Sequence, residues 1–434
     1  MNQLLMLTTY GVKNIEKPIT LEFANSTIEN GIKKVNNVKG IFGYNGVGKS
    51  ALISSVDFYK SIVCGNNYLL QHDVQECLNK LINYKQQEFF FSIVFALTKN
   101  SVIRHSIKLN RNNITSNFVI TEEKVDVSVG RTLNGDYKTL IEKHNQEISF
   151  GKNDNSGPFS FQKKSDLDYT SIVQDYFIQI LDKNVRLGEL NDFQKNLVIL
   201  YLFADSIDVF MLDSDKHETY HFDKSCYHGL LKHAEELKEV GENNWIDHYS
   251  DEDIIPKDKL PMYEKDNIKL QKFLKLFKPE IKQIKLKKSI EGNVLHIRKI
   301  FAYDDYEVEM EFESSGIKQL VKLFSYLSRC ALGNIVFIDD IDINMNTVYL
   351  EKLISFYRKY GKGQLIFTSH NIEAMEALKA QAKAIVILGV ENSVDTWIGK
   401  GNISPINHYL KGNFPNSPMN IEDFDFINVF SKSE

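Results

Sequence analysis

Eight consecutive residues constrain this chain more than any other feature: Gly43-Tyr44-Asn45-Gly46-Val47-Gly48-Lys49-Ser50. They match the pattern G-x-x-x-x-G-K-[ST] in full. The apolar segment 38–42 predicts a strand before them, and the apolar positions of segment 51–63 predict a helix after them. Glycines let backbone N–H groups converge on an anion, and the helix N-terminus adds its dipole. The pattern therefore predicts a phosphate-binding loop between a strand and a helix.

The residue types in this loop predict how a nucleotide is held. We expect Lys49 to reach the β- and γ-phosphates of ATP and to act in catalysis, and the Ser50 hydroxyl to bind magnesium. A chance glycine-rich turn is the alternative, which the flanking strand and helix disfavour. Further contacts with ATP are predicted at Gly43, Asn45, Gly46, Gly48 and Ala51.

A second motif is an apolar strand, predicted at 335–338, that ends in two carboxylates, Asp339 and Asp340. A magnesium ion on the phosphates needs a carboxylate from a neighbouring strand end, and Asp339 suits that role. Asp340 could polarise the attacking water as general base. The alternative is a buried strand that ends in a polar turn, and it is less favoured once a full phosphate loop is present.

Three further segments follow an order seen in a known group of proteins. They are Glu313-Ser314-Ser315-Gly316, Thr368-Ser369-His370-Asn371 after another apolar strand, and Tyr409 to Pro418 near the C-terminus. In this order the chain resembles the ABC-type ATPases of the group that includes RecF, the SMC proteins and the OLD-family nucleases. More narrowly, it resembles the stand-alone ATPase subunits of prokaryotic antiviral and abortive-infection systems such as Septu and PARIS.

The resemblance and the strand and helix patterns together predict an α/β fold. It is an ABC-type ATPase head, with a P-loop sheet, an antiparallel β layer and a helical insertion. Residues 1–165 would form the N-terminal half of the head with the phosphate loop and β layer. Residues 166–280 would form the helical insertion, and residues 281–434 the C-terminal half of the head.

The resemblance also implies roles for single residues. Ser315 and Gly316 would face the γ-phosphate of a second subunit, so that two protomers enclose ATP. His370 would be a switch histidine at the γ-phosphate. Gln87, or its neighbour Gln86, would be the glutamine near magnesium and water. The bland alternatives stay open: Ser-Ser-Gly could cap a helix beginning near residue 317, His370 could be structural, and the two glutamines could belong to a solvated loop.

Two departures from the family pattern affect the expected activity. The strand that ends in Asp339 and Asp340 corresponds to the Walker B motif of the family. The residue after its first aspartate is usually Glu, and here it is Asp340, whose side chain is one methylene shorter. Because a general base must come within hydrogen-bond reach of its water, we predict slow hydrolysis and a long-lived ATP-bound state. In addition, the segment 344–347 lacks the histidine of the family's S-L-H-P, which puts signalling through this loop in doubt.

Segments outside these motifs give a coarser prediction. β-branched and aromatic residues predict strands at 4–7, 19–23, 88–97, 102–109, 117–120 and 125–129. Apolar periodicity predicts helices at 172–181, 192–210, 227–240 and 267–277, with a loop at 243–261. Strands are also expected at 281–301, 307–312 and 365–367.

Composition excludes several classes of protein. The 434 residues carry a net charge of −5, which disfavours a globally basic nucleic-acid binder. No C-x-x-C pair occurs among the four cysteines, and we expect a cytoplasmic protein without a signal peptide or membrane span. A cluster of histidines and one cysteine matches no standard zinc pattern, so a polar surface is favoured over a metal site there. Its members are His217, His221, Cys226, His228 and His233. Nine lysines between 265 and 288 favour a solvated face over a nucleic-acid or acidic-partner surface.

Together the motifs predict a slow ATPase with ATP and Mg²⁺ as cofactors, and the resemblance implies that it acts as a subunit of a bacterial anti-phage defence complex. It would dimerise around ATP, sense infection and control a nuclease or toxin encoded nearby. A RecF-like DNA-repair or DNA-tethering ATPase and an ATP-binding scaffold with little turnover remain alternatives. The sequence contains no recognised nuclease motif.

Overall fold

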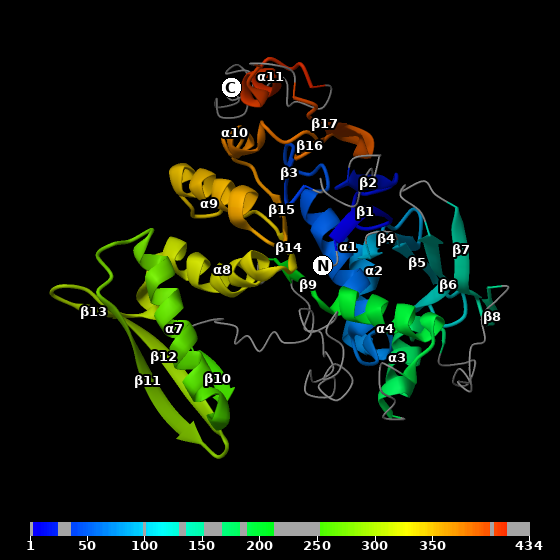
Figure 1. The fold of residues 1–434 in the computed structure, drawn as a ribbon, viewed down its shortest axis with the longest axis horizontal. Helices are drawn as coiled ribbons and strands as arrows, with labels where there is room; N and C mark the ends of the chain where they lie inside the picture. The colour runs from blue at the N-terminus through cyan, green and yellow to red at the C-terminus, as the bar shows by residue number, and fades with distance from the viewer. Residues whose placement is uncertain are drawn as a thin grey trace, which may run out of the picture.

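The computed structural model describes residues 3–24, 36–98, 101–129, 136–151, 167–182, 189–211, 252–399 and 403–414. The described strands form a P-loop sheet, an antiparallel layer and the sheet of a separate lobe (Figure 1). This is the α/β class that the sequence predicts.

The P-loop sheet has the strand order β17-β16-β3-β15-β14-β9. Its strands are β3 (Val38–Phe42), β9 (Ile207–Phe210), β14 (Ile335–Ile338), β15 (Gln364–Thr368), β16 (Ile385–Leu388) and β17 (Val394–Thr396). Neighbours from β16 to β9 are parallel, and β17 pairs with β16 antiparallel. Every residue of β3, β14, β15 and β16 is buried, as expected for a parallel sheet that is covered on both faces.

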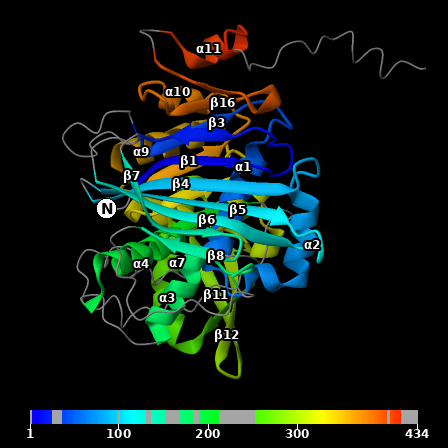
Figure 2. The same ribbon diagram turned by 90° about the vertical axis from the view of Figure 1, so that its right-hand side faces the viewer.

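The antiparallel layer has the order β2-β1-β4-β5-β6-β7-β8, and Figure 2 shows its strands side by side across one side of the molecule. The strands are β1 (Gln3–Tyr10), β2 (Ile19–Glu22), β4 (Glu88–Thr98), β5 (Ser101–Arg111), β6 (Phe118–Val129), β7 (Tyr137–His144) and β8 (Glu147–Phe150). The predicted strands at 4–7, 19–23, 88–97, 102–109, 117–120 and 125–129 lie within these or differ by one residue at an end.

Helix α1 (Lys49–Cys64) joins the layer to the P-loop sheet. Its apolar side chains share one core with strands of both sheets and with α3 (Ile172–Asp182) and α4 (Asp192–Asp205). The short elements η1 (Tyr68–Leu70) and α2 (His72–Leu81) follow α1 on the same side. A single buried cluster therefore fixes the phosphate loop at the N-terminus of α1 against the antiparallel layer.

The opposite face of the P-loop sheet is covered by a second core. The helices that contribute to it are α8 (Ser315–Leu332), α9 (Thr347–Tyr360), α10 (Ala374–Leu378) and α11 (Pro405–Leu410). The turn η7 (Val390–Asn392) connects β16 to β17. Among the described residues, no helix has both the length and the apolar character needed to cross a bilayer.

A separate lobe stands to one side of the head and is joined to it by α8 (Figure 1). It contains β10 (Glu252–Pro256), η5 (Lys257–Lys259), α7 (Leu260–Lys275), β11 (Gln283–Glu291), β12 (Val294–Ala302), β13 (Glu307–Glu309) and η6 (Met310–Phe312). The strand order is β10-β12-β11, with β13 also paired to β12. Helix α7 packs with β11, β12 and the first half of α8 in a third core.

The structure corrects two predictions in the segment 166–280. The helix predicted at 192–210 ends at Asp205, and Ile207–Phe210 pair in parallel with β14 instead. The loop predicted at 243–261 contains strand β10 and the start of α7. In both places pairing with a distant strand overrides the local pattern. The helix predicted at 227–240 and the histidine cluster lie outside the described residues.

Candidate functional site

Three parallel strands bring the predicted motifs to one edge of the P-loop sheet. Strand β15 lies between β3 and β14, with Thr368 paired to Ile41 and Phe367 to Ile338. Beyond the strands, the Ser369 N–H donates to the Ile41 carbonyl at 3.1 Å. Because ligands of open α/β sheets bind at the carboxyl ends of parallel strands, the phosphate loop, the two aspartates and the His370 segment face one site.

The phosphate loop has the backbone that a nucleotide-binding turn needs. Gly43 has φ 146°, and a Cβ there would lie 2.5 Å from the Leu388 carbonyl oxygen. Gly48, with φ 106°, is the N-cap of α1. The Lys49 Nζ donates to the carbonyls of Gly43 at 2.8 Å and Tyr44 at 3.1 Å, so the ammonium lies inside the loop. The phosphate-loop residues predicted to contact ATP are thus together at the N-terminus of α1.

A support for the loop comes from residues that the sequence did not single out. Asn14 Nδ2 donates to the Gly46 carbonyl. Asn392 Nδ2 in turn donates to the Asn14 carbonyl at 3.0 Å, and its Oδ1 accepts from the Glu16 and Lys17 N–H groups at 2.8 and 3.0 Å. These segments border a hollow of about 580 Å³ beside the loop. The turn after β16 therefore buttresses the phosphate loop from nearly 350 residues away in the chain.

The two aspartates are oriented by one hydroxyl group. Asp339 is buried, and its Oδ1 accepts from Thr368 Oγ1 at 2.6 Å. The same hydroxyl accepts from the Asp340 N–H at 2.7 Å. Asp340 has φ 46°, a left-handed backbone that Asp tolerates better than Glu. Thr368 was noted in the sequence as part of a motif, but its role depends on a contact across 29 residues.

His370 lies next to the second aspartate. Its Nε2 is 3.7 Å from Asp340 Oδ1, and its side chain is 45% exposed. The segment is held by Asp342, whose carboxylate accepts from the His370 N–H at 3.3 Å and from the Asn371 N–H at 3.1 Å. The role of Asp342, like those of Asn14, Asn392 and Thr368, could not be predicted from the sequence.

The charges at this edge interact with one another. Burial raises the pKa of Asp340, and the Asp339 carboxylate raises it further, while His370 and Lys49 act in the opposite direction. Burial lowers the pKa of Lys49, and the carboxylates of Asp340, Asp339 and Asp342 oppose that shift. One ammonium therefore faces several carboxylates, an arrangement suited to phosphate together with a divalent cation.

The Ser-Ser-Gly segment begins α8, two residues earlier than expected. Ser314 is the N-cap, and its side chain accepts from the Ile317 N–H at 3.4 Å. Ser315 is exposed in the first turn. A Cβ on Gly316 would lie 2.8 Å from the Asn344 carbonyl oxygen, so the helix packs closely on the turn after the aspartates. The cap and the exposed hydroxyl therefore belong to different serines.

The two glutamines are engaged with their surroundings. Gln87 Nε2 donates to the Tyr84 carbonyl at 2.9 Å, and its Oε1 accepts from Arg111 Nη1 at 3.1 Å. Gln86 Nε2 donates to the carbonyl of Glu16, a residue that borders the hollow beside the phosphate loop. A magnesium or water role for either glutamine stays a prediction.

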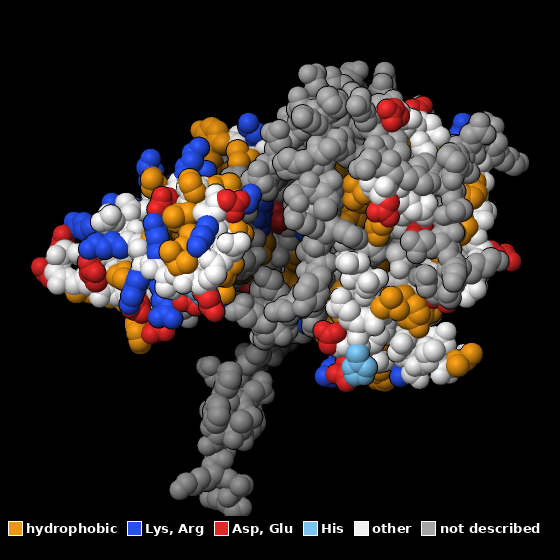
Figure 3. Space-filling view, turned by 90° about the horizontal axis from the view of Figure 1, so that it is seen from below, with side chains coloured by type: hydrophobic (Ala, Val, Ile, Leu, Met, Phe, Trp, Pro, Cys, Tyr) orange, Lys and Arg blue, Asp and Glu red, His pale blue; other side chains and the backbone are white. Residues whose placement is uncertain are grey.

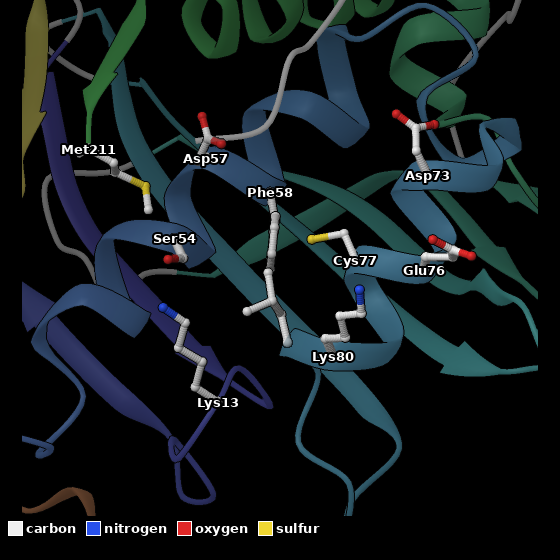
Figure 4. Close-up of a pocket in the computed structure, with 10 residues that line it drawn as sticks. Lys13, Ser54, Asp57, Phe58, Asp73, Glu76, Cys77, Lys80 and Met211 are labelled. Atoms are coloured by element: carbon white, nitrogen blue, oxygen red, sulfur yellow. The ribbon is translucent and has the colours of Figure 1, made fainter. Parts of the chain in front are cut away.

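A second hollow, of about 230 Å³, is lined mainly by side chains of α1 and α2 (Figure 4). Ser54, one turn after Ser50, lines it together with residues from α2. Two lysines and three carboxylates surround it, and burial raises the pKa of the Cys77 thiol to about 11. Because these charges leave no positive excess, we assign the phosphates to the loop and not to this hollow.

Comparison with known protein families identifies the chain. A family described as "AAA domain, putative AbiEii toxin, Type IV TA system" matches residues 40–376. The chain belongs to this AAA family. The match begins in β3, ends in α10 and includes the phosphate loop, Ser315, both aspartates and His370.

Solved structures similar to this AAA protein include SMC heads and RecF. An SMC head with an extended coiled coil from Pyrococcus furiosus, bound to the C-terminal domain of ScpA, has a TM-score of 0.41 and 13% identity, covering 92% of this chain and 97% of that one. The SMC head of Thermotoga maritima has a TM-score of 0.33 and 14% identity, and the match covers 92% of this chain and 99% of that one. RecF with ATP has a TM-score of 0.40 and 12% identity, and the match covers 91% of this chain and 98% of that one. At such TM-scores these likenesses say nothing of ligand or partner. No curated protein matches the chain.

Proposed function

We propose that this AAA protein binds Mg-ATP in the phosphate loop and hydrolyses it slowly. The observation that carries the proposal is the meeting of Lys49, Asp339, Asp340 and His370 at one sheet edge, next to the N-terminus of a 16-residue helix. Lys49 would hold the β- and γ-phosphates, and the loop N–H groups with the helix dipole would hold the remaining charge.

Ser50 and Asp339 would bind the magnesium ion. Mg²⁺ on a nucleotide takes one or two protein ligands together with phosphate oxygens and water. The buried Asp339, held by Thr368, and the half-buried Ser50 hydroxyl at the start of α1 fit that need. The ion would neutralise phosphate charge, while these two side chains fix its position.

Asp340 would act as the general base, with His370 beside it. Its short side chain and left-handed backbone restrict where its carboxylate can reach, and a base must come within about 3 Å of its water. His370 Nε2, 3.7 Å from Asp340 Oδ1, would sense the γ-phosphate. Slow turnover and a persistent ATP-bound state are the expected results.

A second copy would complete the site. Ser315 and Gly316 begin an 18-residue helix, and Ser315 is exposed. The N-terminus of α8 can therefore offer a hydroxyl, N–H groups and a helix dipole to a phosphate bound elsewhere. Asn344 lies against Gly316, so the turn after the aspartates would share the same interface.

Mixing two inactive variants tests this arrangement. Lys49→Met removes the phosphate lysine, and Ser315→Arg blocks the surface that faces the partner. A mixed dimer has one site with both defects and one intact site. Each variant alone should be inactive, and an equal mixture should recover roughly a quarter of wild-type phosphate release, since half of the dimers are mixed and half of their sites are intact. No recovery in the mixture would contradict a shared site.

In the cell, we propose that the protein is the ATPase subunit of an anti-phage defence complex and controls a partner effector. The family description, which names a putative toxin of a toxin–antitoxin system, supports this reading. Purification of the protein together with the product of the neighbouring gene tests it. ATP-dependent binding of that product is expected, and its failure to bind in any nucleotide state would contradict the proposal.

The DNA-tethering alternative has less support from the lobe surface. Six of the nine lysines between 265 and 288 form ion pairs with acidic side chains. Figure 3 shows lysine and arginine interspersed with acidic and apolar side chains over the lobe. Paired lysines release few counterions when a polyanion binds, so DNA should not stimulate phosphate release. Clear stimulation by DNA would favour the RecF-like reading.

A further inference from the structure

Helix α8 is divided between two hydrophobic cores. Ile317, Leu320 and Val321 in its first half pack in the core of the lobe. Leu323 and Leu327, further along the helix, pack in the core under the P-loop sheet, and Phe324 between them packs in the core of the lobe. A displacement of the lobe relative to the sheet would therefore act on this helix, whose N-terminus carries Ser315, as well as on the contact of Phe277 with Tyr349 of α9.

The start of α8 is also tied to the lobe by a partly buried polar cluster. The Glu313 side chain is 3% exposed and accepts from Lys278 Nζ at 3.3 Å, from the Ser314 N–H at 3.0 Å and from the Tyr303 hydroxyl. Lys278 Nζ also donates to Tyr303 Oη at 2.6 Å and lies 4.5 Å from the centre of its ring. Lys278 follows α7, and Tyr303 follows β12 directly.

The chemistry of the cluster suits a positioning role. Burial, and then the hydrogen bond to Glu313, raises the pKa of Tyr303 well above its usual value, so the hydroxyl remains a donor. An ion pair of which only the carboxylate is buried contributes little stability compared with apolar packing, but it fixes geometry through directed hydrogen bonds. The fixed group here includes the backbone N–H of Ser314, the residue that caps α8.

We propose that Lys278, Tyr303 and Glu313 hold the Ser314–Gly316 turn in the position that engages ATP on a second protomer, and so couple the lobe to the ATP step. The inference rests on the proposed ATP-dependent dimer. The three are positioning residues, because none of them reaches the phosphate loop of its own chain. A partner that binds the lobe would then change ATP-dependent dimerisation and hydrolysis through this cluster.

Two conservative variants test the proposal: Tyr303→Phe, which removes one hydroxyl, and Glu313→Gln, which removes one charge. The matched control is Lys282→Met, which breaks an exposed ion pair with Asp304 at 3.1 Å in the same region of the lobe. For each protein, three quantities are measured: affinity of the dilute protomer for a fluorescent ATP analogue, ATP-dependent dimerisation by light scattering, and kcat for phosphate release.

If the cluster couples the lobe to ATP, the variants should change dimerisation and kcat but not the ATP affinity of the protomer. ATP affinity of the protomer should stay within about twofold of wild type, while dimerisation and kcat fall about tenfold, the effect of one lost charge-assisted hydrogen bond. The control should match wild type in all three. If the folded variants dimerise and turn over like wild type, or if their protomer affinity falls in parallel, the cluster is only structural. A wild-type protein that binds ATP without dimerising would instead refute the proposed function itself.

Discussion

Thr368 Oγ1 donates a 2.6 Å hydrogen bond to Asp339 Oδ1 and accepts one from the Asp340 N–H at 2.7 Å. We expect Thr368→Val, which keeps the shape and removes the hydroxyl, to lower kcat about tenfold and to raise the magnesium concentration needed for half-maximal turnover. The carboxylate loses its fixed orientation, and a buried N–H loses its acceptor. Phosphate release measured over a magnesium titration checks both effects.

The matched control is Thr368→Ser, which keeps the hydroxyl and should stay close to wild type. If Thr368→Val responds to magnesium as wild type does, Thr368 does not orient the magnesium ligand. If both variants lose activity equally, the methyl group rather than the hydrogen bond is the important part.

Asp340 combines a short carboxylate with a φ of 46°. We expect Asp340→Glu to hydrolyse ATP faster, since the added methylene brings the carboxylate closer to its water, and to be less stable by about 1 kcal/mol, because Glu tolerates a left-handed backbone less well. Phosphate release and urea unfolding measure the two effects. Asp340→Asn keeps the backbone and should bind ATP without turnover. Equal kcat for wild type and Asp340→Glu would remove the argument for a slow enzyme.

Gly316 lies against the turn that follows the aspartates. In Gly316→Ala the new Cβ would approach the Asn344 carbonyl oxygen to 2.8 Å, so the first turn of α8 must shift. We expect ATP-dependent dimerisation to weaken severalfold while ATP binding to the protomer is unchanged, which light scattering and nucleotide titration can separate. Dimerisation at the wild-type ATP concentration would show that the interface tolerates the shift.

Lys39 gives a pH dependence of stability. Its pKa is lowered from the usual 10.5 to about 7, first by burial and then by the charge of Lys383, while Glu22 opposes the shift. Between these two pH values the unfolded chain binds more protons at this residue than the folded one, so its contribution makes the free energy of unfolding rise with pH. Below about pH 7 the buried ammonium is protonated and its cost is complete.

Lys39→Met should remove this contribution. Urea unfolding of wild type and variant is compared from pH 6 to about pH 10. We expect the variant to be the more stable protein at low pH, with the difference shrinking as pH rises. A difference that does not change with pH would mean that Lys39 has the same protonation in both states. The comparison uses Met because it fills nearly the same volume without the ammonium.

The parts of the site that the sequence predicted are local. The phosphate loop, the two aspartates and His370 each come within two residues after a short apolar strand, and the carboxyl ends of parallel strands meet at one edge of the sheet. The role of Thr368 could not be found in this way, because it consists of hydrogen bonds to residues 28 and 29 positions away. The support from Asn392 depends on a still longer separation, of 378 residues to Asn14.

The parts of the fold that were predicted wrongly also depend on distant pairing. Ile207–Phe210 directly follow a helix with the same apolar character, so periodicity could not separate the strand from the helix, and pairing with β14 decides it. Strand β10 contains Pro256 and two acidic residues, a composition typical of loops. It becomes a strand because β12, about 40 residues later, provides an edge for it.

The position of β3 has a consequence for how the chain matures. This strand, which leads into the phosphate loop, lies between β15 and β16 in the sheet, and both are made more than 320 residues later. While the ribosome is still translating the middle of the protein, β3 has neither neighbour, and exposed strand edges of this kind invite aggregation. If the chain binds nucleotide as proposed, we expect binding to follow the synthesis of β15 and β16, and therefore also the synthesis of His370.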